Sequence, residues 1–234
     1  MANRIVILGG GESGVGAAIL AQAKGYDVFV SDSKAIAPLF KAELEEHGIA
    51  YEEGRHTMDR ILNASEVIKS PGIPNKVPVI QALQQQAIPV IGEIEFAFRY
   101  MGSSKLVAIT GSNGKSTATS LIHHICRTGG LDCALVGNIG FSFAKQVAVD
   151  PKPVYIAEIS SFQLDDTVFF KPHIAVLLNI TEDHLDRYDY NFDNYIASKF
   201  SIARQQDEND FFIYCDDDPV TIANFSKYPI YSKT

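Results

Sequence analysis

Residues 106–117 are Leu-Val-Ala-Ile-Thr-Gly-Ser-Asn-Gly-Lys-Ser-Thr, and they decide the fold. The apolar run predicts a strand covered on both faces, as the strands of parallel sheets are. The glycines predict a tight loop, and a helix is expected from about Lys115 to Thr128. Loop N–H groups and a helix N-terminus both favour an anion, so the stretch predicts an ATP-type phosphate-binding loop. Its residues are Gly111, Ser112, Asn113, Gly114, Lys115, Ser116 and Thr117.

This loop carries the charge and the hydroxyl that ATP chemistry requires. Lys115 would neutralise the β- and γ-phosphates, and Ser116 could ligate Mg²⁺. The spacing differs from the common G-x-x-x-x-G-K-[ST] pattern, whose first glycine would fall at Ile109. The sequence instead matches a shorter form, Thr110-Gly111-x-x-Gly114-Lys115-Ser116.

An earlier stretch repeats the same order of strand, glycine loop and helix. Ile5–Leu8 predicts the strand, and the spacing Gly9-x-Gly11-x-x-Gly14 matches a dinucleotide fingerprint. Asp32 ends the next strand about 20 residues later, where a carboxylate could accept hydrogen bonds from a ribose or a base. We therefore expect a ligand with a diphosphate. NAD is one candidate, because the loop recognises the diphosphate rather than the nicotinamide, and a purely structural turn is the alternative.

Strands and helices alternate along the sequence, which predicts an α/β fold with doubly wound parallel sheets. We expect a Rossmann-like domain over residues 1–93 and a P-loop NTPase-like α/β central domain over residues 94–234. Further strands are expected at Asp27–Val30, Glu66–Lys69, Pro89–Ile91, Cys133–Val136, Val154–Ile159, Ile174–Leu178, Phe211–Tyr214 and Pro229–Tyr231. Further helices are expected at Pro38–His47, Pro78–Gln86, Phe192–Arg204 and Pro219–Phe225, with a connecting helix after Glu93.

The composition is that of an ordinary globular protein and excludes several classes of function. Apolar residues make up 46% of the chain and charged residues 21%. A formal charge of −8 argues against a nucleic-acid partner, which would require a basic face. No apolar run approaches the roughly 20 residues that span a bilayer, so no membrane partner is expected. The three cysteines form no metal motif, and no signal peptide is recognised, so we expect a cytoplasmic protein.

Polar residues follow two of the expected strands in the second half. Glu158 ends an apolar strand, where its carboxylate is placed to ligate Mg²⁺ opposite the phosphate-binding loop. His184 lies in a polar cluster after the strand at Ile174–Leu178 and is a candidate metal ligand, since loops on a rigid scaffold commonly carry function. The remaining histidines, including His56, are expected to be structural. Spacing alone identifies Lys199 only as a helix lysine.

Four segments together resemble the Mur ligase family. They are Thr110–Thr117, Gly137-Asn138-Ile139-Gly140, Glu158-Ile159-Ser160-Ser161-Phe162-Gln163-Leu164 and Asn179-Ile180-Thr181-Glu182-Asp183-His184-Leu185-Asp186-Arg187. The Ser-Ser-Phe-Gln-Leu run resembles the family member that adds D-glutamate, and Ser70-Pro71-Gly72-Ile73 is also typical of it. The resemblance implies that ATP phosphorylates the carboxylate of UDP-N-acetylmuramoyl-L-alanine. The amine of D-glutamate then attacks the acyl phosphate, in cytoplasmic synthesis of a peptidoglycan precursor.

The resemblance also assigns roles to residues. Lys115, Glu158, His184 and Lys199 are implied as catalytic residues, and Ser116, Glu158, His184 and Lys199 as ligands of two Mg²⁺ ions. Lys199 is expected to be carbamylated, because that modification turns a cation into an anion that can orient a metal. The first domain is implied to bind the UDP substrate instead of NAD. Its predicted contacts, with two from the second domain, are Gly11, Ser13, Gly14, Asp32, Ser33, Pro71, Gly72, Asn138 and Ser160.

The resemblance finally implies a third domain, which binds D-glutamate and which this sequence is expected to lack. The central domain is also expected to be truncated at Thr234. We therefore expect the 234-residue chain to bind the UDP substrate without turnover. Three alternatives remain: the L-alanine-adding member of the family, an NAD-dependent oxidoreductase or sensor, and a non-catalytic nucleotide-binding regulator.

Overall fold

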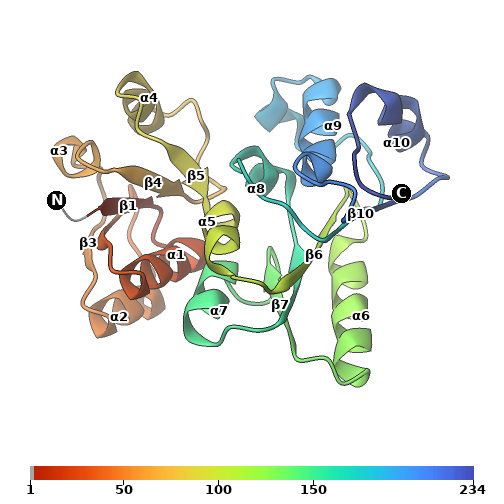
Figure 1. Ribbon diagram of the computed structural model, residues 1–234. Coiled ribbons are helices and arrows are strands. Elements are labelled where there is room, and N and C mark those ends of the chain that lie inside the picture. Colours follow the sequence, from red (N-terminus) through yellow and green to blue (C-terminus); the bar gives the residue numbers. More distant parts are fainter. Residues whose placement is uncertain (1–2) are drawn as a thin grey trace. The chain divides into compact units, whose positions relative to one another are not determined.

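The computed structural model describes residues 3–234 and contains two parallel α/β units (Figure 1). The first unit comprises the chain up to Met101 together with Phe141–Pro151 and Asp166–Val168. The second comprises Gly102–Gly140, Lys152–Asp165 and Phe169–Thr234. The predicted fold class is confirmed, because each unit is built on a parallel sheet with helices between the strands.

The sheet of the first unit has the strand order β3-β2-β1-β4-β5, with all pairs parallel. Its strands are β1 (Arg4–Leu8), β2 (Asp27–Ser31), β3 (Ala50–Glu52), β4 (Glu66–Lys69) and β5 (Val90–Gly92). Its helices are α1 (Glu12–Ala23), α2 (Pro38–Glu46), α3 (Met58–Ile61), α4 (Pro78–Gln85) and α5 (Glu93–Tyr100). The order reverses beside β1, so the carboxyl ends of β1, β2 and β4 meet where open α/β sheets bind ligands.

Close packing of α1 against β1 depends on Gly14. A Cβ at this position would lie 1.9 Å from the Gly9 carbonyl oxygen, so no larger residue fits without moving the helix. Core residues of the sheet, among them Val6, Leu8 and Phe29, are completely buried. The apolar runs of the sequence therefore form the interior of the sheet, as expected for strands covered on both faces.

A helix from later in the sequence completes this unit. Helix α7 (Phe143–Val149) belongs to the first unit and packs against α1 and α5. The carboxylate of Glu93 accepts hydrogen bonds from Ser142 Oγ at 2.7 Å and from the Ala144 N–H at 2.6 Å. Gly16 of α1 leaves room for this contact, since a Cβ there would lie 2.0 Å from Ser142 Oγ. Neither this helix nor its docking was predicted from the sequence.

The sheet of the second unit has the strand order β10-β9-β6-β8-β7, again parallel. Its strands are β6 (Lys105–Thr110), β7 (Cys133–Gly137), β8 (Val154–Glu158), β9 (Ile174–Leu177) and β10 (Phe211–Tyr214). Its helices are α6 (Lys115–Thr128), α8 (Ser161–Asp165), α9 (Phe192–Phe200) and α10 (Pro219–Asn224), with 3₁₀ turns at Leu185–Tyr188, Ser201–Ala203 and Phe225–Lys227. Among residues 3–234, no helix is both long and apolar enough to cross a membrane.

One predicted strand is wrong. Residues 229–231 form no strand, and Lys233 pairs with Phe211 in one isolated bridge. Pro229 has no N–H to donate to a neighbouring strand, which explains why an apolar stretch of this length does not pair. The short elements β3, α3, α7 and α8 were not predicted.

Candidate functional site

The predicted phosphate-binding loop, residues 111–117, follows β6, the central strand of the second sheet. Gly111 has a φ of +153°, and a Cβ there would lie 3.0 Å from Leu178 Cβ and 3.3 Å from the Asn179 backbone. Gly114 has a φ of +81° and directly precedes α6. Both positions favour glycine, the first because another segment approaches closely and the second because of its left-handed backbone.

The segment after β9 holds the loop in shape. The Ser112 N–H donates to the Asn179 carbonyl at 2.9 Å, and the Asn113 N–H donates to Asn179 Oδ1 at 2.9 Å. The Ser112 hydroxyl donates to the Thr181 carbonyl at 2.9 Å. Two stretches that the sequence analysis singled out separately, residues 111–117 and 179–187, are therefore joined by hydrogen bonds.

Lys115 and Lys199 both contact the loop backbone. The Lys115 ammonium donates to the Gly111 carbonyl at 2.9 Å and to the Ser112 carbonyl at 3.0 Å. Lys199, in α9, is 1% exposed, and its Nζ donates to the same Gly111 carbonyl at 2.9 Å and to Thr110 Oγ1 at 3.2 Å. Burial and, secondly, the charge of Lys115 lower the pKa of Lys199 to about 7, against the opposing effect of nearby carboxylates.

Glu158 supplies a buried carboxylate one strand away. Glu158, in β8, pairs in register with Ile109 of β6, and it is 1% exposed. One oxygen accepts a hydrogen bond from Asn138 Nδ2 at 2.7 Å, whereas the other has no hydrogen-bond partner among the residues that the structure describes. A buried carboxylate oxygen without a partner is costly, so this atom fits the role of a ligand for a divalent cation.

His184 lies at the start of the 3₁₀ turn that precedes α9, in a left-handed conformation with a φ of +51°. Its Nε2 is 3.5 Å from Asp183 Oδ2, and its ring centroid is 5.1 Å from that of Phe162. No cluster of three or more His, Cys, Asp or Glu side chains within residues 3–234 has the arrangement of a metal site. Mg²⁺ binding at Glu158 and Ser116 would therefore rely on phosphate and water oxygens for its other ligands, as Mg²⁺ commonly does.

A cavity of about 650 Å³ opens beside the phosphate-binding loop. Asn113, Gly114 and Thr117 line it on the loop side. Its remaining lining residues come from α6, from β9 and the segment after it, and from the end of β10. A space of this size, next to the predicted phosphate-binding loop, is large enough for a small-molecule ligand.

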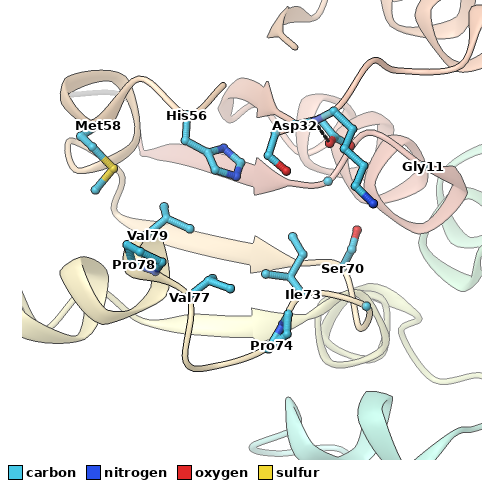
Figure 2. Close-up of a pocket in the computed structure, with 14 residues that line it drawn as sticks. Gly11, Asp32, His56, Met58, Ser70, Ile73, Pro74, Val77, Pro78 and Val79 are labelled. Carbon is cyan, nitrogen blue, oxygen red and sulfur yellow. Dashed lines mark hydrogen bonds between the residues drawn. The ribbon is translucent and has the colours of Figure 1, made fainter. Parts of the chain in front are cut away.

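A second cavity, of about 800 Å³, lies within the first unit at the ends of its strands (Figure 2). Asp32, Gly11 and Ser70 lie toward one end of it, and Met58, Pro78 and Val79 lie toward the other (Figure 2). Four of the predicted UDP-substrate residues line this cavity: Gly11, Asp32, Ser33 and Gly72. Ser13, Gly14 and Pro71 are not among the lining residues, and Asn138 and Ser160 belong to the other unit.

The carboxylate of Asp32 organises the glycine loop. Its Oδ2 accepts a hydrogen bond from the Gly10 N–H at 2.7 Å, and its Oδ1 accepts one from the Lys34 N–H at 2.8 Å. Asp32 therefore fixes the backbone around the cavity, in addition to the ligand contact that the sequence predicted for it.

His56 is a cavity residue that the sequence analysis treated as structural. It lines the 800 Å³ cavity, and its Nδ1 lies 2.7 Å from Ser31 Oγ, which also donates to Glu52 at 2.8 Å. His56 follows the short strand β3, which the sequence did not reveal. No sequence signal indicated it, because His56 reaches the cavity through the pairing of β3 with β2.

In the second unit, Asn138 and Ser160 have defined partners. Asn138 donates to Glu158, as described above, and the Ser160 hydroxyl donates to Gln163 Oε1 at 3.0 Å. Gln163 Oε1 also accepts the Ser160 N–H at 2.9 Å, so Gln163 fixes the turn into α8. The Ser-Ser-Phe-Gln-Leu run is thus a helix start that its own glutamine stabilises.

Two family models match the chain. The model described as "Mur ligase middle domain" matches residues 109–232, and "Mur ligase MurD-like, N-terminal domain" matches residues 3–92. Two curated relatives are named UDP-N-acetylmuramoylalanine–D-glutamate ligase. The one from Bacteroides fragilis is 55% identical over 97% of this chain, and the one from Cytophaga hutchinsonii is 52% identical over 98%. The chain spans about half the length of each, 51%.

Solved structures share the fold at low sequence identity. One is the UDP-N-acetylmuramate:L-alanyl-gamma-D-glutamyl-meso-diaminopimelate ligase from Neisseria meningitides, with a TM-score of 0.68 and 19% identity, covering 99% of this chain and 78% of that one. Another is the UDP-N-acetylmuramate-alanine ligase from Thermotoga maritima, with a TM-score of 0.59 and 20% identity, covering 93% of this chain and 50% of that one. At these identities the likeness concerns the fold alone.

Proposed function

We propose, from the premise that this chain belongs to the Mur ligase family, that it provides the UDP-substrate and ATP sites of a D-glutamate-adding ligase. The observation that carries the proposal is the convergence of Lys115 and Lys199 on the Gly111 carbonyl, with the buried Glu158 on the adjacent strand. The names of the curated relatives support the choice of D-glutamate. In this proposal, residues 1–93 form the UDP-substrate domain and residues 94–234 belong to the ATP-binding central domain of a cytoplasmic enzyme.

The proposed reaction transfers the γ-phosphoryl group of ATP to the carboxylate of UDP-N-acetylmuramoyl-L-alanine, which gives ADP and an acyl phosphate. The amine of D-glutamate attacks the acyl carbon, an amide bond forms, and inorganic phosphate leaves. Loop N–H groups and Lys115 hold the phosphates and neutralise their charge, since phosphoryl transfer depends mainly on positioning and electrostatic stabilisation. Mg²⁺, when bound, neutralises further charge, and Ser116, Glu158, His184 and a carbamylated Lys199 would hold the two ions.

The cavity of the first unit suits the nucleotide half of the substrate. Gly11 and the start of α1 favour a diphosphate, while Asp32, Ser33 and Gly72 supply polar groups around it. Its volume of about 800 Å³ falls within the usual range for ligand pockets. Ser13, Gly14 and Pro71 would act through the backbone beside it, and Asn138 and Ser160 would contact the muramoyl-alanine end.

Calorimetric titration of the chain tests the proposal. UDP-N-acetylmuramoyl-L-alanine should bind, UDP-N-acetylmuramate without alanine should bind less tightly, and NADH should give no heat. Tight NADH binding with no response to the muramoyl ligand would assign the first glycine loop to an oxidoreductase or sensor. We expect no turnover by residues 1–234 alone, so phosphate release that depends on D-glutamate would contradict that part of the proposal.

A further inference from the structure

The segment Ser70–Pro74, which follows β4, forms one wall of the 800 Å³ cavity. Ser70, Gly72, Ile73 and Pro74 all line the cavity, and Figure 2 shows Ser70, Ile73 and Pro74 along one side of it. The Ser70 N–H donates to the Leu8 carbonyl at 2.9 Å, which ties the start of the segment to β1. This segment is called the cavity wall below.

Lys69, the last residue of β4, connects the cavity wall to a buried carboxylate. Its side chain is 2% exposed, and its Nζ lies 2.6 Å from Asp166 Oδ2, which is 7% exposed. The same Nζ donates to the Ile73 carbonyl at 2.9 Å. One ammonium group therefore joins the wall to a residue almost a hundred positions later in the chain.

Asp166 is itself held in place by the first unit. Its carbonyl accepts the Gly92 N–H at 2.8 Å, and two residues later the Val168 N–H donates to Glu95 Oε2 at 3.0 Å. Glu95 is completely buried. The carboxylate that faces Lys69 therefore comes from a segment with fixed backbone, not from a mobile surface side chain.

The energetics of this pair point to a role other than stability. Removing two charges from water costs several kcal/mol per ion, and a buried ion pair is often no more stabilising than well-packed apolar residues of similar size. A hydrogen bond from a charged donor is, however, about twice as strong as a neutral one. Lys69 makes this stronger bond to the Ile73 carbonyl, which is in the wall.

We propose that Lys69, neutralised by Asp166, is a positioning residue that fixes the Ile73 carbonyl and so holds the cavity wall in the shape that binds the UDP substrate. This inference rests on the proposed function of the cavity. The ammonium does not touch the substrate. It fixes the position of the wall backbone, which contacts the substrate in the proposed function. The charge of Asp166 offsets the cost of burying the ammonium.

The test compares Lys69→Met, which removes the ammonium that faces the buried Asp166 carboxylate, with the double variant Lys69→Met/Asp166→Leu, which removes both charges. Lys41→Met is the control, because Lys41 also pairs with a carboxylate in this unit, Glu53 at 2.6 Å, but its ammonium bonds Glu53, which does not line the cavity, and not the cavity wall. Thermal unfolding measures stability, and calorimetry measures the affinities for UDP-N-acetylmuramoyl-L-alanine and for ATP. Hydrogen exchange follows the amides of Ser70, Gly72 and Ile73.

Lys69→Met should be clearly less stable than the wild type, and the double variant should recover most of that loss. The double variant should still bind UDP-N-acetylmuramoyl-L-alanine roughly tenfold more weakly, exchange its wall amides faster, and bind ATP as the wild type does. If the role of Lys69 were merely structural, the affinities for UDP-N-acetylmuramoyl-L-alanine and for ATP would either both fall together with stability or both stay unchanged. Wild-type affinity and exchange in the double variant would overturn the inference, whereas a wild type that does not bind the muramoyl ligand would overturn the proposed function itself.

Discussion

At the scale of single residues, the second unit brings two lysines to one carbonyl oxygen. Lys115 and Lys199 both donate to Gly111, so two positive charges would lie close together if both were protonated. Burial and this repulsion lower the pKa of Lys199 to about 7. An appreciable fraction of its amine is therefore neutral near physiological pH, and a neutral amine is the form that reacts with carbon dioxide to give a carbamate.

The first prediction is that Lys199 takes up carbon dioxide. With carbon-13 bicarbonate, the chain should give a carbamate resonance above about pH 7 that fades below it, because the protonated amine does not react. Lys199→Arg removes the reactive amine and should lose the resonance. A free ammonium at Lys199 under the same conditions, or an unchanged signal in Lys199→Arg, would contradict the prediction.

The second prediction concerns Lys115. Lys115→Ala should abolish measurable ATP binding, because the variant lacks the only charged side chain that the loop 111–117 itself contributes. Affinity for UDP-N-acetylmuramoyl-L-alanine should be unchanged. Lys105→Ala, at the exposed start of β6, is the control and should bind ATP normally. Unaltered ATP affinity in Lys115→Ala, measured by calorimetry, would remove the loop from the proposed mechanism.

The loop between β6 and α6 could be predicted from sequence, because its glycine spacing is a local property, and its binding of phosphate remains a prediction. The hydrogen bonds that join residues 111–113 to 179–181 were not predicted, because the two stretches lie far apart in the sequence. The roles of Glu158, His184 and Lys199 remain predictions. Lys69 and His56 could not be found from sequence. Their importance depends on Asp166 and on β3, respectively, which lie far away or are too short to leave a pattern.

At the scale of elements, α5 and α7 are joined by a buried carboxyl group. Glu93 is 3% exposed, and burial raises its pKa to about 7, despite the hydrogen bonds from Ala144 and Ser142. The carboxylate of Glu12, which accepts the Ser142 N–H at 3.2 Å, raises the pKa further. Glu93 therefore gains or loses its proton near neutral pH, and the contact between these two helices depends on pH there.

The third prediction is a pH dependence of stability. The folded state binds a proton at Glu93 more tightly than the unfolded state, whose pKa is near 4.5, so this contribution is complete below about pH 4.5 and is lost as pH rises through 7. Glu93→Gln keeps an oxygen for Ser142 and Ala144 but cannot ionise. Relative to this variant, the wild type should lose of the order of 3 kcal/mol of unfolding free energy between about pH 4.5 and 8.

Urea unfolding across that range measures the difference, and the exposed Glu46→Gln of α2 is the control. Parallel curves for the wild type and Glu93→Gln would show that Glu93 does not titrate in this way.

The main strands and the long helices could be predicted from apolar runs and from prolines at helix starts, such as Pro38 and Pro78. The short strand β3 could not, because Ala50 is exposed and only three residues pair. Helix α7 could not either, since its apolar face is buried by α1 and α5, which precede it by many residues. The strand at Pro229–Tyr231 was wrongly predicted because the prediction used apolar character alone and identified no neighbouring strand for it to pair with.

At the scale of the whole molecule, the chain does not complete the first unit before it starts the second. Phe141–Pro151 and Asp166–Val168 return to the first unit after β6 and β7 have been formed in the other. These two segments provide contacts to Glu93, Glu95 and Lys69. A first unit without them would expose the buried helix faces and lose these contacts, although Glu95 would keep its ion pair with Arg99.

The fourth prediction is that residues 1–101 alone do not form a stable domain. The fragment should show a weak, poorly cooperative thermal transition, because it lacks α7 and the partner of Lys69. The same fragment with residues 141–151 joined by a flexible linker should regain cooperativity, and a scrambled 141–151 segment is the control. Circular dichroism melting measures both, and a fragment 1–101 as stable as the intact chain would contradict the prediction.

Because Asp166–Val168 belong to the first unit, that unit cannot be completed until these residues have been synthesised. Ribosomes add about 5–20 residues per second, so several seconds separate the synthesis of Met101 from that of Val168. During this delay the residues of β3, β2, β1, β4 and β5 have been synthesised but Asp166, which faces Lys69, has not. In this interval the helix faces that the later segments bury are open to a chaperone. Synonymous codons that slow translation before Val168 would lengthen the interval.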